Sequence, residues 1–345
     1  MSVAKPRTRL IDIALEAKVS PMTVASVLTG AGGKRIRVGA DTAERVREIA
    51  RRLDYRPNMA AQQLSGVSSR LIGLVGHDWF SAMPLRMLAW LNKVADKESF
   101  RLIVSQTSGN EQPLRDYLRE CDARGVDGVI YLAHGDDSVW EESRELFEQI
   151  PCVVVLMGNP GIAHAHCVDS DFAGGVIQAI EHLHQRGRRR IVQVLEDLNL
   201  DVNRKRRAGQ IQAFESLGME FNEQSIRVAT KDWALDAPAF DGLVEELVHD
   251  RGADAILADT DAGALALMNA MRRRGIEPGK DVSIVGWGHE PYSLLSSPTL
   301  TTVQFHLDQI ASHAVKLVHA HSRNHRDHNP ERIMVPADLV IRGSS

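Results

Sequence analysis

Apolar residues recur at helical spacing in two short segments near the start of the chain. These positions are Leu10, Ile13, Ala14 and Ala17 in the first segment and Val24, Val27 and Leu28 in the second. The spacing i, i+3, i+4 and i+7 predicts a helix with one apolar side. Ser20 is a natural N-cap for the second helix, with Pro21 at its first position.

The other side of the second helix carries small and polar residues. Two helices joined by a three-residue turn, the second presenting such residues, are typical of a helix-turn-helix that places its second helix in the DNA major groove. An ordinary helical hairpin is the alternative. The residues expected to contact DNA are Ser20, Pro21, Met22, Thr23, Ser26 and Thr29. A third helix over about 41–53 completes an all-α head.

From residue 71 onward, short apolar runs alternate with amphipathic helical patterns. The expected strands are 71–75, 102–105, 128–132, 152–156, 191–195, 255–258 and 283–286, and the expected helices lie near 84–97, 111–124, 138–149, 172–186, 204–217, 237–250 and 261–274. This alternation predicts parallel sheets with helices on both faces. The length exceeds one comfortable core, so we expect two α/β lobes with a ligand cleft at the carboxyl ends of the strands.

Charge is distributed unevenly along the chain. Residues 1–70 hold thirteen Lys or Arg against six Asp or Glu, and the remaining residues hold 28 against 39. A basic head on an acidic body is typical of a DNA-binding module carried by a globular domain. Cys121, Cys152 and Cys167 lack metal-ligand spacing and are expected as buried free thiols. No apolar run reaches membrane-spanning length, so we expect a cytoplasmic protein without membrane contact.

No motif in the chain specifies catalysis. A P-loop, G-x-G-x-x-G, G-x-S-x-G and a zinc motif are all absent from the sequence. We therefore expect a protein that is not an enzyme and needs no cofactor. Histidines crowd a polar tract at His313, His319, His321, His325 and His328. Their spacing is irregular, which favours solvated histidines over a metal site.

Short motifs along both parts of the chain are characteristic. In the head they are V-S-P-M-T-V-A-S-V-L (19–28), D-Y-R-P-N (54–58) and A-Q-Q-L-S-G (61–66). In the core they are L-I-G-L-V (71–75), G-V-D-G-V-I (125–130), H-L-H-Q-R-G-R-R-R-I (182–191), N-R-K-R-R-A-G (203–209), D-V-S-I-V-G (281–286) and S-P-T-L-T-T-V (297–303). In this order and spacing they resemble the LacI/GalR family of transcription regulators.

The resemblance implies a homodimer that binds double-stranded operator DNA, most often as a repressor. A small-molecule effector would close the cleft of a two-lobed, periplasmic-binding-protein-like core and change the DNA affinity. An effector-controlled activator or dual regulator is the first alternative, and a sugar-binding protein without a regulatory role is the second.

The family pattern also divides the chain. It implies a head at 1–56, a hinge helix and linker at 57–70, and a core at 71–345. Lobe 1 would span about 71–168 and 299–330, and lobe 2 about 169–298 and 331–345. In the hinge, Leu64 would wedge into the minor groove, and Asn58 and Gln62 would also bind DNA. Ala25-Ser26 replaces the usual Ser-Arg, which predicts an uncommon operator, and Lys18 replaces the usual turn glycine.

Effector contacts follow from the same resemblance at Arg204, Trp233 and Asp261. A guanidinium can clamp hydroxyls or a carboxylate, an indole can stack on a sugar, and a carboxylate can accept hydroxyl hydrogen bonds. From the residues alone, a surface arginine, a core tryptophan and a helix-capping aspartate are the alternatives. Further contacts are expected at Asp78, Trp79, Phe80, Trp287 and His289.

The expected cavity departs from the family in its charge. Carboxylates usual after the strands near 152–156 and 283–286 are missing, and His289 is gained together with Arg204. This change predicts a cationic cavity, which would favour a sugar acid or sugar phosphate. A sugar of some kind is expected ahead of a purine.

Overall fold

The computed structural model describes residues 8–29, 38–55, 68–77, 79, 82–108, 110–133, 143–158, 161–228, 237–321 and 329–345. The chain divides into two compact units, which meet at Leu71 and Ile72. The loop at 30–37 and most of the expected hinge segment lie outside the described residues.

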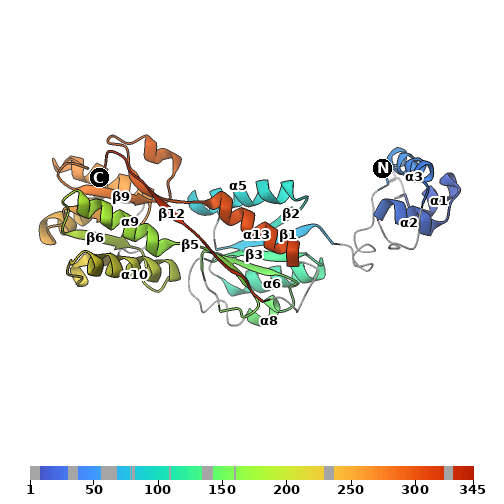
Figure 1. The fold of residues 1–345 in the computed structure, drawn as a ribbon, viewed down its shortest axis with the longest axis horizontal. Helices are drawn as coiled ribbons and strands as arrows, with labels where there is room; N and C mark the ends of the chain where they lie inside the picture. The colour runs from blue at the N-terminus through green and yellow to red at the C-terminus, as the bar shows by residue number, and fades with distance from the viewer. Residues whose placement is uncertain are drawn as a thin grey trace. The chain divides into compact units, whose positions relative to one another are not determined.

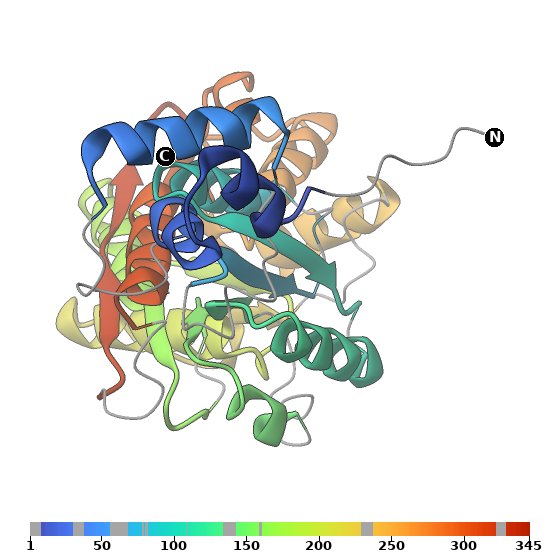
Figure 2. The ribbon, with the colours of Figure 1, turned by 90° about the vertical axis from the view of Figure 1, so that its right-hand side faces the viewer.

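The first unit contains three helices that pack on one another, α1 (Leu10–Ala17), α2 (Pro21–Thr29) and α3 (Ala40–Arg52) (Figure 2, blue). Their apolar stripes meet in a small core of Ile13, Ala14, Ala17, Val24, Val46, Ile49 and Ala50. Val27, Leu28 and Leu53 pack against it. The apolar stripes predicted for the first two helices are therefore confirmed, and the third helix contributes a stripe of its own.

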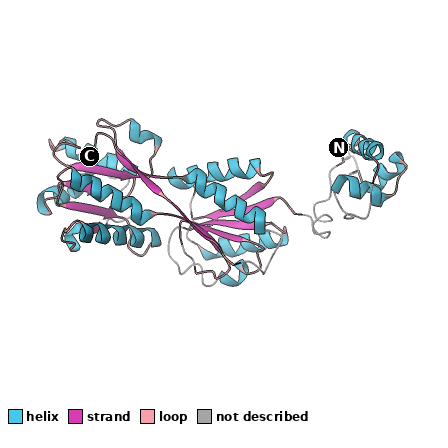
Figure 3. Cartoon of the chain, viewed as in Figure 1, coloured by secondary structure: helices cyan, strands magenta, loops and turns pink. Residues whose placement is uncertain are grey.

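The second unit contains two sheets of six strands each (Figure 3). The first sheet has the order β11 (Arg332–Val335), β5 (His166–Ser170), β4 (Val153–Leu156), β3 (Gly128–Leu132), β1 (Leu71–Gly76) and β2 (Arg101–Gln106). The second has the order β12 (Ala337–Val340), β10 (Thr301–Phe305), β9 (Ser283–Trp287), β8 (Ala255–Leu257), β6 (Ile191–Leu195) and β7 (Ile226–Val228). The recorded registers are parallel except for β12, which runs antiparallel to β10.

Helices cover both faces of each sheet, as the alternating pattern predicts. Around the first sheet, α5 (Ala82–Lys97) and α13 (Leu307–His321) lie on one face, and α6 (Glu111–Ala123) and α8 (Arg144–Phe147) on the other (Figure 1). Around the second sheet, α9 (Phe172–Gln185) and α10 (Asp201–Ser216) belong to one apolar core. The helices α11 (Ala237–Val244) and α12 (Asp261–Arg273) belong to another. Gly209 allows α10 to approach α9, since a Cβ there would lie 2.6 Å from the Ala173 carbonyl oxygen.

The chain crosses between the two lobes three times, after β5, after β10 and between β11 and β12. The dark red segment in Figure 1 carries the third crossing. The lobe boundaries differ from the expected ones at two places. β10 pairs in the second sheet and β11 in the first, so the last two crossings fall near residues 306 and 336 instead of 298 and 330. Strands this short and polar leave the crossing points poorly marked in the sequence.

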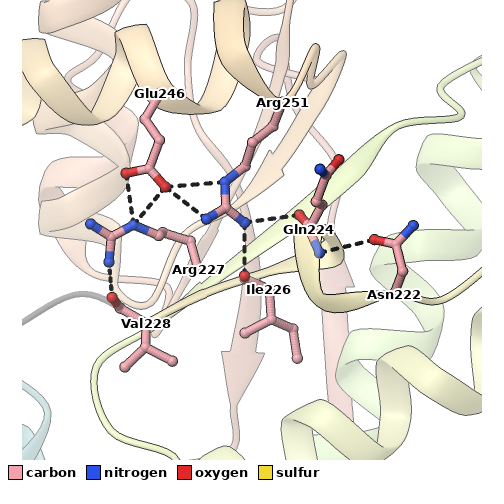
Figure 4. A network of polar contacts seen from close by, with 7 residues as sticks. All are labelled: Asn222, Gln224, Ile226, Arg227, Val228, Glu246 and Arg251. Atoms are coloured by element: carbon pink, nitrogen blue, oxygen red, sulfur yellow. Dashed lines mark hydrogen bonds and ion pairs between the residues drawn. The ribbon is translucent and has the colours of Figure 1, made fainter.

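The edge strand β7 is held by a polar network (Figure 4). Glu246, from the π-helical turn η4 (Glu245–Asp250), pairs with Arg227 at 2.8 Å and with Arg251 at 2.7 Å. Arg251 also donates to the carbonyl oxygens of Gln224 and Ile226. These bonds hold the first residue of β7 and the helical turn before it against η4.

Two further expectations concern the whole chain. The three cysteines are buried and free, as predicted. Among the described helices, none combines the length and the apolar character needed to cross a lipid bilayer.

Candidate functional site

Helix α2 begins with an N-cap at Ser20 and has one exposed side. The hydroxyl oxygen of Ser20 accepts a hydrogen bond from the Thr23 amide at 3.1 Å, which fixes the first turn of the helix. Val24 is buried, so the helix side opposite it faces outward. Met22 is 66% exposed, Ser20 and Pro21 are also exposed, and Thr23 and Ser26 are half-buried. Such a face of small side chains suits close approach to base edges.

The turn between α1 and α2 keeps its form despite the lysine. Lys18 adopts a left-handed conformation, with φ 54° and ψ 45°, and the Val19 amide donates to the Ala14 carbonyl oxygen. Glycine is the usual residue here because it enters this conformation at no steric cost. The helix-turn-helix therefore forms with Lys18 in the glycine position.

The DNA-contact residues expected in the hinge cannot be placed. Asn58, Gln62 and Leu64 lie outside the described residues. Thr29 is the last residue of α2. Its assignment and those of the hinge residues stay predictions.

A cavity of about 480 Å³ lies in the core, lined by residues from both lobes. Its lining follows the carboxyl ends of β3, β4, β6, β8, β9 and β10, with the first turns of α5, α9, α10 and α12. This is where the alternating pattern predicts a ligand cleft. Cavities of this size hold small-molecule ligands in other proteins.

One wall of the cavity is aromatic. Phe172 and Trp287 stack with ring centres 6.4 Å apart, and Phe305 meets Trp287 edge to face at 5.7 Å. The Arg206 guanidinium lies over the Trp287 ring, 4.1 Å from its centre. The indole Nε1 of Trp287 and Nε of Arg206 are buried donors with no hydrogen-bond partner among the described residues.

Arg206 is fully buried, and its charge is already balanced. Its Nη1 lies 2.5 Å from a carboxylate oxygen of Asp259, and its Nη2 donates to the Ala258 carbonyl oxygen at 3.0 Å. A buried guanidinium is tolerated only when it is paired in this way. The Arg206 guanidinium therefore brings no uncompensated charge to the cavity.

Asp261 lines the cavity and joins three elements. It begins α12, accepts the Glu290 amide at 2.6 Å and accepts the Thr302 hydroxyl at 2.5 Å. Burial raises the pKa of Asp261 to about 6, although these hydrogen bonds act in the opposite direction. Its carboxyl group therefore already has structural partners on both oxygens.

Two ion pairs join the lobes beside the cavity. Arg86 of α5 donates to the Gly288 carbonyl oxygen and to the Glu290 carboxylate, each at 2.9 Å. Lys205 of α10 pairs with Asp169 at the end of β5. Both contacts tie a residue of one lobe to a residue of the other.

The expected effector residues divide into three groups. Asp261 and Trp287 line the cavity. Arg204, Trp79 and His289 do not: Arg204 is 46% exposed and bonds to Asn199 and Asp201, and the Trp79 indole donates to the Ser105 carbonyl oxygen. The last group, Asp78, Phe80 and Trp233, lies outside the described residues.

The expectation of a cationic cavity is contradicted by the lining. Five carboxylate residues line it, namely Glu196, Asp201, Asp259, Asp261 and Glu290, whereas Arg206 is the one basic residue of the described lining. Burial, with the charges of Arg342 and Arg86, also lowers the pKa of His289, so this imidazole is neutral at pH 7. The described lining therefore carries more acidic than basic residues.

Sequence reasoning missed Arg206, Asp259 and the aromatic pair Phe172 and Phe305. For Arg206 a signal was available, because it lies on the same side of α10 as Gly209 and Ala213, the buried stripe of that helix. For the other three, the sequence offers no pattern that separates cavity lining from ordinary core.

The comparisons with known proteins agree with this architecture. Residues 9–58 match the family model for bacterial regulatory proteins, lacI family, and residues 180–345 match the periplasmic binding protein-like domain. The HTH-type transcriptional regulator DegA of Bacillus subtilis is 26% identical over 98% of both chains. Catabolite control protein A of Staphylococcus xylosus is 23% identical, over 97% of this chain and 98% of its own.

Solved structures share the fold. The Lac repressor dimer bound to operator and the anti-inducer ONPF aligns with a TM-score of 0.81 and 23% identity, over 98% of this chain and 99% of that one. The transcriptional regulator CelR in complex with cellobiose aligns with a TM-score of 0.69 and 22% identity, over 98% of this chain and all of that one. A three-helix head that matches the regulator model precedes a two-lobed core that matches the binding-protein model. The head therefore carries the domain of the lacI family of bacterial regulatory proteins, and the core carries a periplasmic binding protein-like domain.

Proposed function

We propose that this chain is a homodimeric, cytoplasmic transcription repressor whose affinity for operator DNA is controlled by a neutral, polyhydroxylated small molecule. The observation that carries the proposal is the combination, in one chain, of an exposed helix-turn-helix face and a ligand-sized cavity between two lobes. The head and the core together contain all the described residues. A DNA-binding protein of this kind can repress transcription by occupying a promoter.

The chemistry of the cavity supports a neutral sugar or polyol over a sugar acid or phosphate. Arg206, the one basic residue of the described lining, is already balanced by Asp259, so an acid or phosphate would find no uncompensated cation there. The aromatic wall offers a surface on which the apolar face of a sugar ring can stack. Trp287 Nε1 and Arg206 Nε supply buried donors for hydroxyl or ring oxygens.

The test measures ligand binding by thermal shift and calorimetry on the full chain. Cellobiose, D-xylulose and glucose are compared with gluconate and glucose 6-phosphate. A neutral ligand at about 100 times its Kd should stabilise the core by about 2.7 kcal/mol. Trp287→Phe keeps one aromatic ring but removes the indole N–H together with part of the stacking surface, and should weaken ligand binding about tenfold. Preferential binding of gluconate or glucose 6-phosphate would refute the neutral-ligand proposal.

DNA control is tested separately, on a duplex selected from a random-sequence library. We expect a palindromic site, bound by two chains, from which the neutral ligand releases the protein. Tighter DNA binding in the presence of ligand would mean that the ligand acts as a corepressor and not as an inducer. Recovery of the ligand chemically unchanged after incubation is expected for a protein that is not an enzyme.

A further inference from the structure

Three side chains from distant parts of the sequence converge at one corner of the first lobe. His166 is the first residue of β5, His321 is the last residue of α13, and Glu331 precedes β11. One possible ligand atom from each lies within 4.8 Å of the other two. The effector cavity does not include any of them.

The spacing of these atoms suits a metal ion. The Nε2 atom of His321 lies 3.2 Å from a carboxylate oxygen of Glu331, and the two imidazole ring centres lie 4.6 Å apart. Around a tetrahedral zinc ion with bonds of about 2.0–2.1 Å, neighbouring ligand atoms lie about 3.3 Å apart. One pair is already at that separation, and the other pairs can reach it through small side-chain movements.

The protonation of His166 is also suitable. Its Nδ1 accepts a hydrogen bond from the Glu331 amide at 3.1 Å, so this nitrogen carries a lone pair and no proton. An ion bound at Nδ1 would replace the amide hydrogen bond. His166 is fully buried, whereas the Glu331 side chain is 52% exposed, so an ion can enter from the Glu331 side.

We propose that His166, His321 and Glu331 form a binding site for a divalent transition-metal ion of the zinc type. Two imidazoles and one carboxylate are a ligand set that zinc accepts, with water completing the coordination. The ion would join β5, α13 and the start of β11. Because β11 leads directly into β12 of the second sheet, it would brace one of the three connections between the lobes. The sequence favoured a solvated side chain for His321, and this proposal makes His321 a metal ligand instead.

The experiment uses the full chain with any affinity tag removed and bound metal stripped with EDTA. Zinc is titrated by calorimetry and the thermal unfolding is followed in parallel. We expect one ion per chain and a higher Tm with zinc. His321→Asn and Glu331→Gln should each weaken zinc binding at least tenfold while leaving the Tm in EDTA within a few degrees of the parent.

The matched control is His319→Asn. His319 lies two residues from His321 on the same helix and pairs with Glu98 at 3.1 Å, outside the proposed site. This variant should bind zinc as the parent does. Absence of saturable zinc binding by the parent would overturn the proposal, and so would undiminished binding by His321→Asn. Neither result bears on the effector cavity, which does not share these residues.

Discussion

Replacing Asp261 by Asn should remove a pH-dependent contribution to the stability of the core. The carboxyl group is completely buried at the start of α12. Its two oxygens accept hydrogen bonds from the Glu290 amide and the Thr302 hydroxyl. An asparagine amide has the same shape: its oxygen can accept from Glu290, and its NH₂ can donate to the Thr302 oxygen, but it does not titrate.

The magnitude follows from the displaced pKa. Burial raises the pKa of Asp261 from 3.8 to about 6, against the opposing hydrogen bonds. Between these two pH values the folded chain holds a proton that the unfolded chain has released, so lowering the pH stabilises the fold. Stability should fall as the pH rises from about 4 to about 6 and then level off. A shift of about two units corresponds to about 3 kcal/mol.

Urea unfolding between pH 4 and pH 7.5, followed by tryptophan fluorescence, measures this effect. All five tryptophans lie after residue 71, so the signal reports on the core and its ligand cavity. The free energy of unfolding of the parent minus that of Asp261→Asn should decrease by about 3 kcal/mol across this range. Asp116→Asn, on an exposed side of α6, is the control and should run parallel to the parent. Parallel curves for the parent and Asp261→Asn would refute the assignment of a raised pKa to burial.

Three other substitutions test separate parts of the molecule. Ser20→Ala removes the N-cap of α2 and should destabilise the head by about 1 kcal/mol. The hydrogen-exchange protection of the α2 amides should then fall about fivefold, and unchanged protection would refute the N-cap role of Ser20. Arg86→Met leaves the Glu290 carboxylate without its cross-lobe partner and should lower the free energy of unfolding in urea by about 2 kcal/mol. Arg115→Met is the control: it removes an ion pair with Glu111 inside α6 and should cost less than about 1 kcal/mol. Leu64→Ala should weaken binding to the selected operator while leaving ligand binding unchanged, and an equal loss of both would contradict the hinge assignment.

The sequence predicts the head well because each helix there has one dominant apolar stripe. The stripes of α1, α2 and α3 have a single way to meet, and the core of Ile13, Val24 and Val46 is the result. Most strands of the core were equally readable, since buried parallel strands are continuous apolar runs such as Gly128–Leu132. The expected strands do not include β5, β7, β10, β11 and β12. In β5 and β11, His166, Asp169 and Arg332 interrupt the apolar pattern.

The cavity shows where sequence reasoning fails and why. Arg204 and Arg206 stand two positions apart in one basic run, and on a helix this separation turns the side chain by about 200°. The buried stripe of α10 fixes which of the two faces inward: Gly209 and Ala213 are buried, and Arg206 shares their side. The position carried over from the family motif is the exposed Arg204, whereas the helical phase of α10 would have selected the buried Arg206.

The charge of the cavity could not be counted from the sequence, because some of its ionic groups have partners far away in the chain. Asp259 neutralises Arg206 across 53 positions, and Arg86 reaches Glu290 across 204. Once such pairs are formed, what a ligand meets is the set of hydrogen-bonding groups left over. Beside the aromatic wall, the N–H groups of Trp287 Nε1 and Arg206 Nε are buried and have no partner among the described residues. Specificity in this site should therefore depend on where the ligand places its oxygen acceptors, and the Trp287→Phe variant measures that dependence directly.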